Sequence, residues 1–185
     1  MLGVIALVLF SESSWMENEL AVELMYGAGM VLTFIGCLGR VWCLVHIAGR
    51  KDNELVMEGP YSMCRNPLYL FSFIATVGVA FSTCTFSIPI LVTVCFLVYY
   101  PLVIRSEEQR LSQIHGEAFL NYCRRVPQFI PSFRAYTSVD KTTVKIQSFE
   151  KGLLDVAWFL FALLASRLNI EIHEAGYGIT LLRLI

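Results

Sequence analysis

The sequence predicts an all-α protein, a polytopic bundle of about five membrane-spanning helices with an amphipathic helix on the cytosolic side. Of its 185 residues, 56% are hydrophobic and only 16% are charged, and the mean hydropathy is +0.62. Soluble domains carry roughly 25% charged residues. This composition excludes a disordered chain, a nucleic-acid-binding domain and a secreted disulfide scaffold. Five spans leave too few residues for a second globular domain, so residues 1–185 are expected to form one membrane-embedded domain.

Five apolar runs account for the predicted spans. The first is too short to cross a bilayer unless it extends through Trp15, because a span needs about 20 residues. The fifth lies within residues 151–170 and carries one carboxylate, Asp155, near its start. The runs are Met1–Phe10, Leu20–Ala48, Leu68–Phe81, Phe86–Ile104 and Leu153–Leu168.

Small residues and turn signals refine the middle spans. Gly27, Gly29, Gly36 and Gly39 form a small-residue face on the second run, which allows a neighbouring helix to approach closely. Leu68–Ile104 contains 37 residues without a charged side chain, enough for two short spans. The Ser82-Thr83-Cys84-Thr85 stretch and Pro89 mark the turn of a helical hairpin between them.

Basic residues predict the orientation in the membrane. Residues 49–67 hold three of them and residues 105–151 hold eight, so these two loops carry 11 of the 14 in the chain. The segment 11–23 instead holds four glutamates and no basic residue. By the positive-inside rule both basic loops face the cytoplasm, as in a bacterial inner membrane. We therefore expect any chemistry on that side.

The first basic loop ends in a helix start. Asn66 followed by Pro67 is typical of an N-cap and the first helical residue. Arg65 then lies beside a helix N-terminus, where an anion such as the carboxylate of an amino-acid-like ligand is stabilised. A turn, a cap and an arginine that reaches the membrane surface explain the same residues without a ligand.

The second basic loop opens with an amphipathic pattern. At 100° per residue one stripe contains Ile104, Glu108, Leu111, His115, Phe119 and Tyr122, whereas Glu107 and Arg110 project elsewhere. An unpaired buried carboxylate is costly, so Glu108 is expected to pair with a cation such as Arg105 or to bind a ligand. An interfacial helix with an ordinary ion pair is the alternative, and His115 fits a partly buried structural histidine.

Other polar residues within the apolar runs are few. Arg40 lies inside the second run, where a charged residue indicates a functional site or an arginine that snorkels to the surface. Tyr61, Tyr69, Tyr99 and Tyr100 fit an interfacial aromatic belt. The three histidines and six cysteines have no metal-ligand spacing, so no metal site is expected.

Two motifs lie in the basic loops, one on each side of the hairpin. The first is Gly59-Pro60-Tyr61, then Arg65-Asn66-Pro67 and Tyr69. The second is Glu107-Glu108, then Leu111, His115-Gly116-Glu117, Tyr122 and Arg125-Val126-Pro127. In this order they resemble the signatures of the isoprenylcysteine carboxyl methyltransferase and phospholipid methyltransferase-like family of integral membrane proteins. The resemblance covers residues 27–131.

The resemblance implies transfer of a methyl group from S-adenosyl-L-methionine at the cytosolic membrane face, with a lipid-facing opening for a hydrophobic acceptor. The catalytic residues that it implies are Arg65, Asn66, Glu108 and Arg125. The cofactor-binding residues that it implies are Gly59, Pro60, Tyr61, Arg65, Asn66, Tyr69, Glu107, Glu108, His115 and Tyr122.

The chemistry of these residue types suits that cofactor. Aromatic faces attract the sulfonium, Arg65 suits the carboxylate, and a buried glutamate suits the amine or the ribose hydroxyls. Many family members carry histidine in place of Asn66, and asparagine cannot act as an acid or base near neutrality.

The expected acceptor is hydrophobic or lipid-like. Carboxyl O-methylation of the isoprenylcysteine type is favoured, and a phospholipid amine or a thiol is the alternative. A non-catalytic membrane scaffold that retains the fold is the competing function. Membrane lipid is an expected partner, whereas nucleic acid and an obligate protein partner are not expected.

Overall fold

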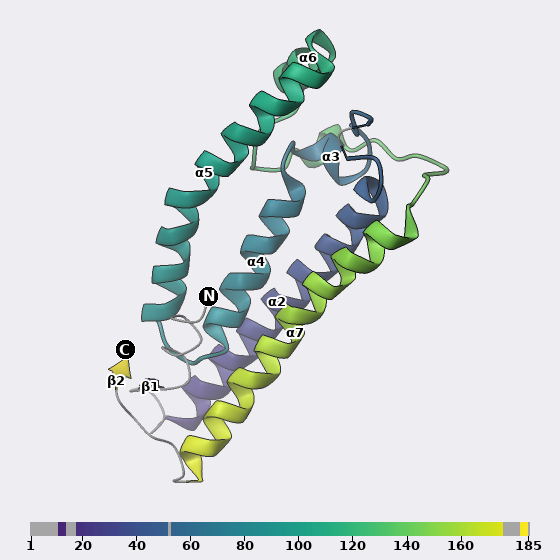
Figure 1. Cartoon of the computed structure of the whole chain (residues 1–185). Helices are drawn as coiled ribbons and strands as arrows, with labels where there is room; N and C mark the ends of the chain where they lie inside the picture. The colour runs from purple at the N-terminus through teal and green to yellow at the C-terminus, as the bar shows by residue number, and fades with distance from the viewer. Residues whose placement is uncertain (1–10, 14–17, 52, 176–181, 185) are drawn as a thin grey trace. The chain divides into compact units, whose positions relative to one another are not determined.

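The structure is a computed structural model that describes residues 11–13, 18–51, 53–175 and 182–184, most of them helical (Figure 1). The predicted first span at Met1–Phe10 lies outside the described residues. The all-α class is confirmed, with a small addition: two three-residue strands pair in parallel. The elements are β1 (Ser11–Ser13), α2 (Glu19–Ile47), α3 (Pro60–Met63), α4 (Pro67–Phe81), α5 (Ser87–His115), α6 (Glu117–Arg125), a 3-10 turn η1 (Phe133–Ala135), α7 (Ile146–Glu174) and β2 (Leu182–Leu184).

Within the described residues, three helices are long and apolar enough to cross a membrane: α2, α5 and α7. The predicted final span at residues 151–170 lies inside α7. Helix α4 is apolar but has 15 residues, which at 1.5 Å per residue gives about 22 Å. That is shorter than the roughly 30 Å hydrocarbon core, so the hairpin consists of one short and one long helix.

The hairpin turn lies where the sequence predicts it. Helix α4 ends at Phe81 and α5 begins at Ser87. Cys84 adopts a positive φ of 56° and its N–H donates to the Phe81 carbonyl at 3.0 Å. Pro89 falls within the first turn of α5, a position where its missing N–H leaves no hydrogen bond unmade.

The predicted amphipathic stripe is divided between the end of α5 and a separate short helix, α6, which buries Phe119 and Tyr122. Helix α5 continues without a break from the apolar segment through the charged residues to His115. Gly116 then takes φ 53°, and α6 begins at the next residue. The polar end of α5 is therefore a rigid extension of a membrane-spanning helix.

The chain divides into two compact units. The first comprises residues 1–36, 73–95 and 157–185, and small residues bring its α2 and α4 parts into contact. A Cβ at Gly29 would lie 2.6 Å from the Ser82 nitrogen, and one at Gly36 would lie 2.6 Å from Ala75 Cβ. The Ser82 and Ser166 hydroxyls join α7 to this unit at 2.7 Å. The predicted glycine face is thus confirmed at Gly29 and Gly36, whereas no described atom lies within 4 Å of a Cβ at Gly27.

The second unit comprises residues 37–72 and 96–156 and contains both motifs. Its buried Arg40, on α2, forms a hydrogen bond with Ser72 of α4 and an ion pair with Asp155 of α7 at 3.6 Å. The two charged residues that the sequence places inside apolar runs therefore pair with each other. Gly39 lies against the Phe71 ring, as the small-residue face predicts.

Candidate active site

The first motif begins with a glycine that no other residue replaces without strain. Gly59 has φ 60° and ψ −133°, a region that is essentially restricted to glycine. A Cβ at this position would also overlap the ring of His46, with Nε2 as the nearest atom. Pro60 then begins α3, and the following Tyr61 is buried. The Gly-Pro-Tyr sequence is thus a tight turn that places the tyrosine side chain inside the second unit.

The segment after α6 holds this turn in place by main-chain hydrogen bonds. The Gly59 N–H donates to the Thr137 carbonyl at 2.8 Å, and the Ser132 N–H donates to the Met63 carbonyl at 2.9 Å. The Arg65 N–H donates to the Pro127 carbonyl at 2.9 Å. The second motif therefore supports the first through its Val-Pro end, and the linker after residue 130, to which the sequence assigns no role, is part of the support.

Asn66 and Pro67 start α4 as predicted. Pro67 is the first residue of the helix, and the Asn66 carbonyl accepts the Leu70 N–H at 3.1 Å, as an N-cap carbonyl does. The Asn66 amide Nδ2 donates to the Gln128 carbonyl at 3.1 Å and to Glu108 Oε1 at 3.4 Å. This side chain therefore connects the helix start to the second motif.

Glu108 pairs across the two motifs. Arg65 Nη1 lies 3.4 Å from Glu108 Oε1, and Gln128 Nε2 donates to Oε2 at 3.2 Å. The expected pairing of Glu108 with a cation is confirmed, but the cation is Arg65 from the loop before α4 rather than Arg105, one turn away on the same helix. The carboxylate is 20% exposed, so these donors replace most of its water.

Glu107 faces the same site as Glu108. The Tyr69 hydroxyl donates to Glu107 Oε2 at 2.6 Å, and Lys51 Nζ lies 2.9 Å from Oε1. The helical projection places Glu107 off the stripe that contains Glu108. An inference from this projection alone that Glu107 lies outside the site would therefore be wrong. The site extends past one face of α5 because α4 and the loop at Lys51 cover the neighbouring face as well.

These residues enclose a pocket of about 120 Å³. Four of the six stripe residues contribute, all except Ile104 and His115, and so does the part of the first motif that follows its turn. The pocket is lined by Ile47, Lys51, Glu54, Leu55, Val56, Tyr61, Arg65, Asn66, Leu68, Tyr69, Glu107, Glu108, Leu111, Phe119 and Tyr122.

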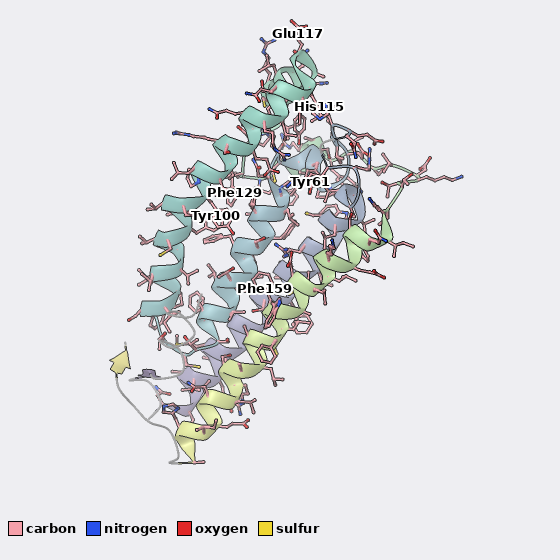
Figure 2. The ribbon with its side chains drawn as sticks, viewed as in Figure 1. Tyr61, Tyr100, His115, Glu117, Phe129 and Phe159 are labelled. Carbon is pink, nitrogen blue, oxygen red and sulfur yellow. The ribbon has the colours of Figure 1, made fainter. Side chains whose placement is uncertain are left out.

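Most of the predicted site residues are in that lining, and four are not. Gly59 and Pro60 form the turn behind Tyr61 instead. The Arg125 Nε donates to the Asn121 carbonyl of its own helix at 3.3 Å, at an exposed position. His115 ends α5, and its Nε2 is buried without a hydrogen-bond partner among the described residues. Figure 2 shows His115 near the end of α5 above Tyr61.

One side of the pocket is formed by residues that the sequence motifs do not predict. Ile47, Leu55 and Val56 supply apolar lining, and Lys51 and Glu54 supply charge. These residues come from the end of α2 and the loop after it, which precede the first motif and carry no recognisable pattern. Among these residues, only Lys51 gave a signal in the sequence, as a basic residue of the loop that precedes the first motif.

The pocket lining is acidic. Glu54, Glu107 and Glu108 face Lys51 and Arg65, so three carboxylates stand against two cations. Such a lining favours a ligand with net positive charge.

Tyr61 and Tyr122, two of the three tyrosines of the lining, remain neutral. Burial raises the pKa of Tyr61 well above its usual value and also raises the pKa of Tyr122. The Tyr122 hydroxyl donates to the Tyr61 carbonyl at 2.7 Å. The two phenols therefore offer uncharged ring faces rather than phenolate anions, which suits contact with a cation.

An aromatic cluster continues from the pocket along the apolar part of α5. The Tyr69 and Tyr100 rings lie 5.3 Å apart, the stacked Phe96 and Tyr100 rings 3.8 Å apart, and Phe96 and Phe129 5.7 Å apart. Phe129 follows α6 in the sequence, and Figure 2 shows it beside Tyr100. Of the tyrosines predicted to form an interfacial belt, Tyr61 is buried and Tyr69 and Tyr100 pack within the unit, whereas Tyr99 is exposed and its place in a belt stays a prediction.

A family model described as phospholipid methyltransferase matches residues 20–118, more than half of the chain. That range contains the hairpin, the first motif and the Glu-Glu pair. With three helices able to cross a membrane, the match defines the class as an integral membrane methyltransferase. The chain belongs to the phospholipid methyltransferase family, and the resemblance seen in the motifs is confirmed.

The curated relatives of the chain include proteins of two kinds: metal-resistance proteins and protein-S-isoprenylcysteine O-methyltransferases. The chain is 34% identical to the cobalt-zinc-cadmium resistance protein CzcN of Cupriavidus metallidurans over 94% of its length and 79% of the relative's. It is 37% identical to the nickel-cobalt-cadmium resistance protein NccN of Alcaligenes xylosoxydans xylosoxydans, over 85% of this chain and 73% of that protein. It is 28% identical to the protein-S-isoprenylcysteine O-methyltransferase of Rattus norvegicus over 64% of this chain and 49% of the relative. No solved structure matches the chain.

Proposed function

We propose that this protein is an S-adenosyl-L-methionine-dependent methyltransferase that methylates a hydrophobic, lipid-like acceptor at the cytoplasmic face of a bacterial inner membrane. Carboxyl O-methylation is the favoured reaction, and methylation of a phospholipid amine or a thiol is the alternative. The proposal rests on the family, on the predicted orientation of the basic loops and on the pocket between the two motifs.

One observation carries the cofactor assignment. Arg65 Nε is buried in the unit and has no hydrogen-bond partner among the described residues, although Arg65 lines the pocket. A buried donor without an acceptor costs about 1–3 kcal/mol. The carboxylate of a bound S-adenosyl-L-methionine supplies that acceptor, and the acidic lining suits the net positive charge of the cofactor.

The remaining pocket residues divide the cofactor's other groups among them. Glu108 accepts from the cofactor's amine, and it is already held in place by Arg65, Asn66 and Gln128. The neutral rings of Tyr61 and Tyr122, which line the pocket, would attract the sulfonium. When bound, the cofactor would supply a methyl group on a positively charged sulfur: a bond from the acceptor lone pair to the methyl carbon would form as the carbon–sulfur bond breaks, leaving a neutral thioether.

Transfer by in-line displacement depends on positioning rather than on a covalent enzyme intermediate. Tyr69 fixes Glu107 by a hydrogen bond, and Lys51 fixes it from the opposite side. A carboxylate acceptor has no proton to lose, so Asn66 is sufficient where relatives of this family carry a histidine. An amine or thiol acceptor requires a base, and Glu107 is the carboxylate next to Tyr69.

Calorimetric titration of S-adenosyl-L-methionine into the purified full chain tests the cofactor site. Arg65→Ala and Glu108→Ala are expected to weaken binding by about 10-fold or more each, because hydrogen bonds to charged groups contribute roughly 1.5–3 kcal/mol. Arg124→Ala and Glu117→Ala change the same charges at exposed positions of α6 and are the matched controls. Unaltered binding in both pocket variants would remove the assignment.

The relatives' names favour a second candidate, a role in bacterial resistance to divalent cobalt, nickel, zinc or cadmium. In a metal-sensitive bacterium, expression of this chain is then expected to raise the cobalt concentration that permits growth. Comparison with Glu108→Ala separates a catalytic role from a scaffold. Equal growth with both forms favours the non-catalytic scaffold, and growth that requires Glu108 favours methyl transfer.

A further inference from the structure

A second hollow adjoins the pocket. It is an open groove of about 450 Å³. Three of its residues, Lys51, Tyr69 and Glu107, also line the pocket, so they form a wall shared by both spaces. The groove is lined by Lys51, Tyr69, Leu102, Val103, Ser106, Glu107 and Arg110.

The groove carries the opposite charge to the pocket. Lys51 Nζ and Arg110 Nη2 approach the same carboxylate oxygen, Glu107 Oε1, at 2.9 and 3.9 Å. The two cationic side chains are 57% and 45% exposed, whereas Glu107 is 19% exposed. Two cations and one carboxylate leave the groove with a net charge of +1, presented outward.

The groove also spans the boundary between apolar and polar surface on α5. Leu102 is exposed and Val103 follows it, and both precede Arg105, the first charged residue of the helix. Ser106, Glu107 and Arg110 continue the same groove on the polar side. An apolar floor with cations at one end matches an amphiphile that lies in the leaflet with its charged group at the surface.

Resting on the proposed function, we propose that this groove binds the methyl acceptor and that the acceptor is an anionic amphiphile. Its carboxylate or phosphate lies between Lys51 and Arg110, and its tail lies along Leu102 and Val103. Tyr69 and Glu107 line both spaces, so the acceptor's charged group would lie directly beside the cofactor pocket. An amphiphile whose only charge is an amine is excluded, because the groove already holds an excess positive charge.

Photolabelling of the full chain in phosphatidylcholine nanodiscs tests the groove. The probe is palmitic acid with a diazirine in its tail, at a mildly alkaline pH that ionises the carboxylate, with hexadecanol and hexadecylamine analogues as matched probes. The measured quantity is the label on residues 98–110 divided by the label on residues 158–164 of α7. The α7 stretch holds Trp158, Phe161 and Leu164, which are exposed and report unspecific labelling from the lipid phase.

The acid is expected to give a ratio about 25-fold above the alcohol and the amine, since each basic side chain at a membrane surface contributes a factor of about five. Arg110→Gln lowers the acid's ratio about fivefold and Lys51→Gln/Arg110→Gln about 25-fold. Arg105→Gln removes the same charge from the same helix outside the groove, and it leaves the ratio unchanged. Hexadecyl phosphate competes, whereas inorganic phosphate does not.

Equal ratios for the acid and the amine would overturn the proposal, as would full labelling in the double variant. Competition by inorganic phosphate would show that the groove binds the charged group without the tail, and it would overturn the assignment of an amphiphile. S-adenosyl-L-methionine binding is measured by calorimetry on the same preparation. Cofactor binding without groove labelling refutes this inference alone, and groove labelling without cofactor binding refutes the proposed function alone.

Discussion

Two glycines with nearly the same backbone allow a direct test of the turn that begins the first motif. Gly59 has φ 60° and ψ −133°, and Gly116 has φ 53° and ψ −128°. A Cβ at Gly59 overlaps the His46 ring, whereas no described atom lies within 4 Å of a Cβ at Gly116. Alanine at either position therefore introduces the same backbone strain, and only Gly59→Ala adds a steric clash.

The expected magnitudes follow from these two contributions. Backbone strain in this region costs about 1–3 kcal/mol for a residue with a Cβ. Overpacking against His46 adds about 1–3 kcal/mol. For a chain of this size 1 kcal/mol lowers the melting temperature by about 2–4 °C. Gly59→Ala is therefore expected to melt about 4–8 °C below Gly116→Ala, taking the clash as about 2 kcal/mol.

A thiol-reactive fluorogenic dye measures unfolding of the detergent-solubilised chain, because Cys37, Cys43, Cys64 and Cys84 are buried and become reactive on unfolding. His46→Ala and the double variant His46→Ala/Gly59→Ala complete a double-mutant cycle, whose coupling isolates the contact between the two positions. The double variant is expected to recover most of the additional loss.

Equal melting temperatures for the two alanine variants would refute the reasoning, because the clash would then contribute nothing. A cycle with no coupling between positions 46 and 59 would refute it independently. S-adenosyl-L-methionine affinity is measured alongside, and we expect it to fall in Gly59→Ala, since the turn places Tyr61 in the pocket.

Two further predictions concern charges near the site. The pKa of Glu58 is lowered: burial by itself raises it, but the hydrogen bonds from Arg50 and the Met57 N–H, together with the charge of Arg50, more than offset burial. The pair therefore contributes its full stability above about pH 4.5 and loses it as the pH falls further. Glu58→Gln is expected to flatten the dependence of melting temperature on pH between about pH 6 and 3, and an unchanged slope would contradict this. In the second case, Asp155→Leu leaves buried Arg40 without this carboxylate and costs about 1 kcal/mol, because Asp155 is 68% exposed, whereas Arg40→Met/Asp155→Leu is expected to recover most of that loss. A double variant no more stable than Asp155→Leu would contradict it.

Much of the site was accessible from the sequence because its parts are contiguous motifs. The first motif brings four lining residues into one short stretch after Gly59: Tyr61, Arg65, Asn66 and Tyr69. Its local signals also predict structure, because the glycine and proline form the turn before α3 and the Asn-Pro pair begins α4. The stripe of the second loop also predicts Glu108, Leu111, Phe119 and Tyr122 in one lining, although Gly116 interrupts the helix between them.

The pairing of charges was not accessible in the same way. Helical projection places Arg105 near Glu108, but the observed partner is Arg65, 43 residues away in the chain. Lys51 reaches Glu107 from a loop with no motif. Arg40 and Asp155 are separated by 115 positions. Such partners depend on the path of the connecting loops, which no local periodicity encodes.

By itself, the sequence determined the class of protein, the all-α fold, the hairpin turn and the two motifs, because hydropathy, helix signals and turn chemistry are properties of neighbouring residues. Only the tertiary structure decided which carboxylate each cation meets, that Glu107 and Glu108 line the same pocket, and that Lys51 and Arg110 turn a second groove positive. Burial makes an unpaired charge costly, so these pairings are specific, but they form only where distant segments of the chain are brought together.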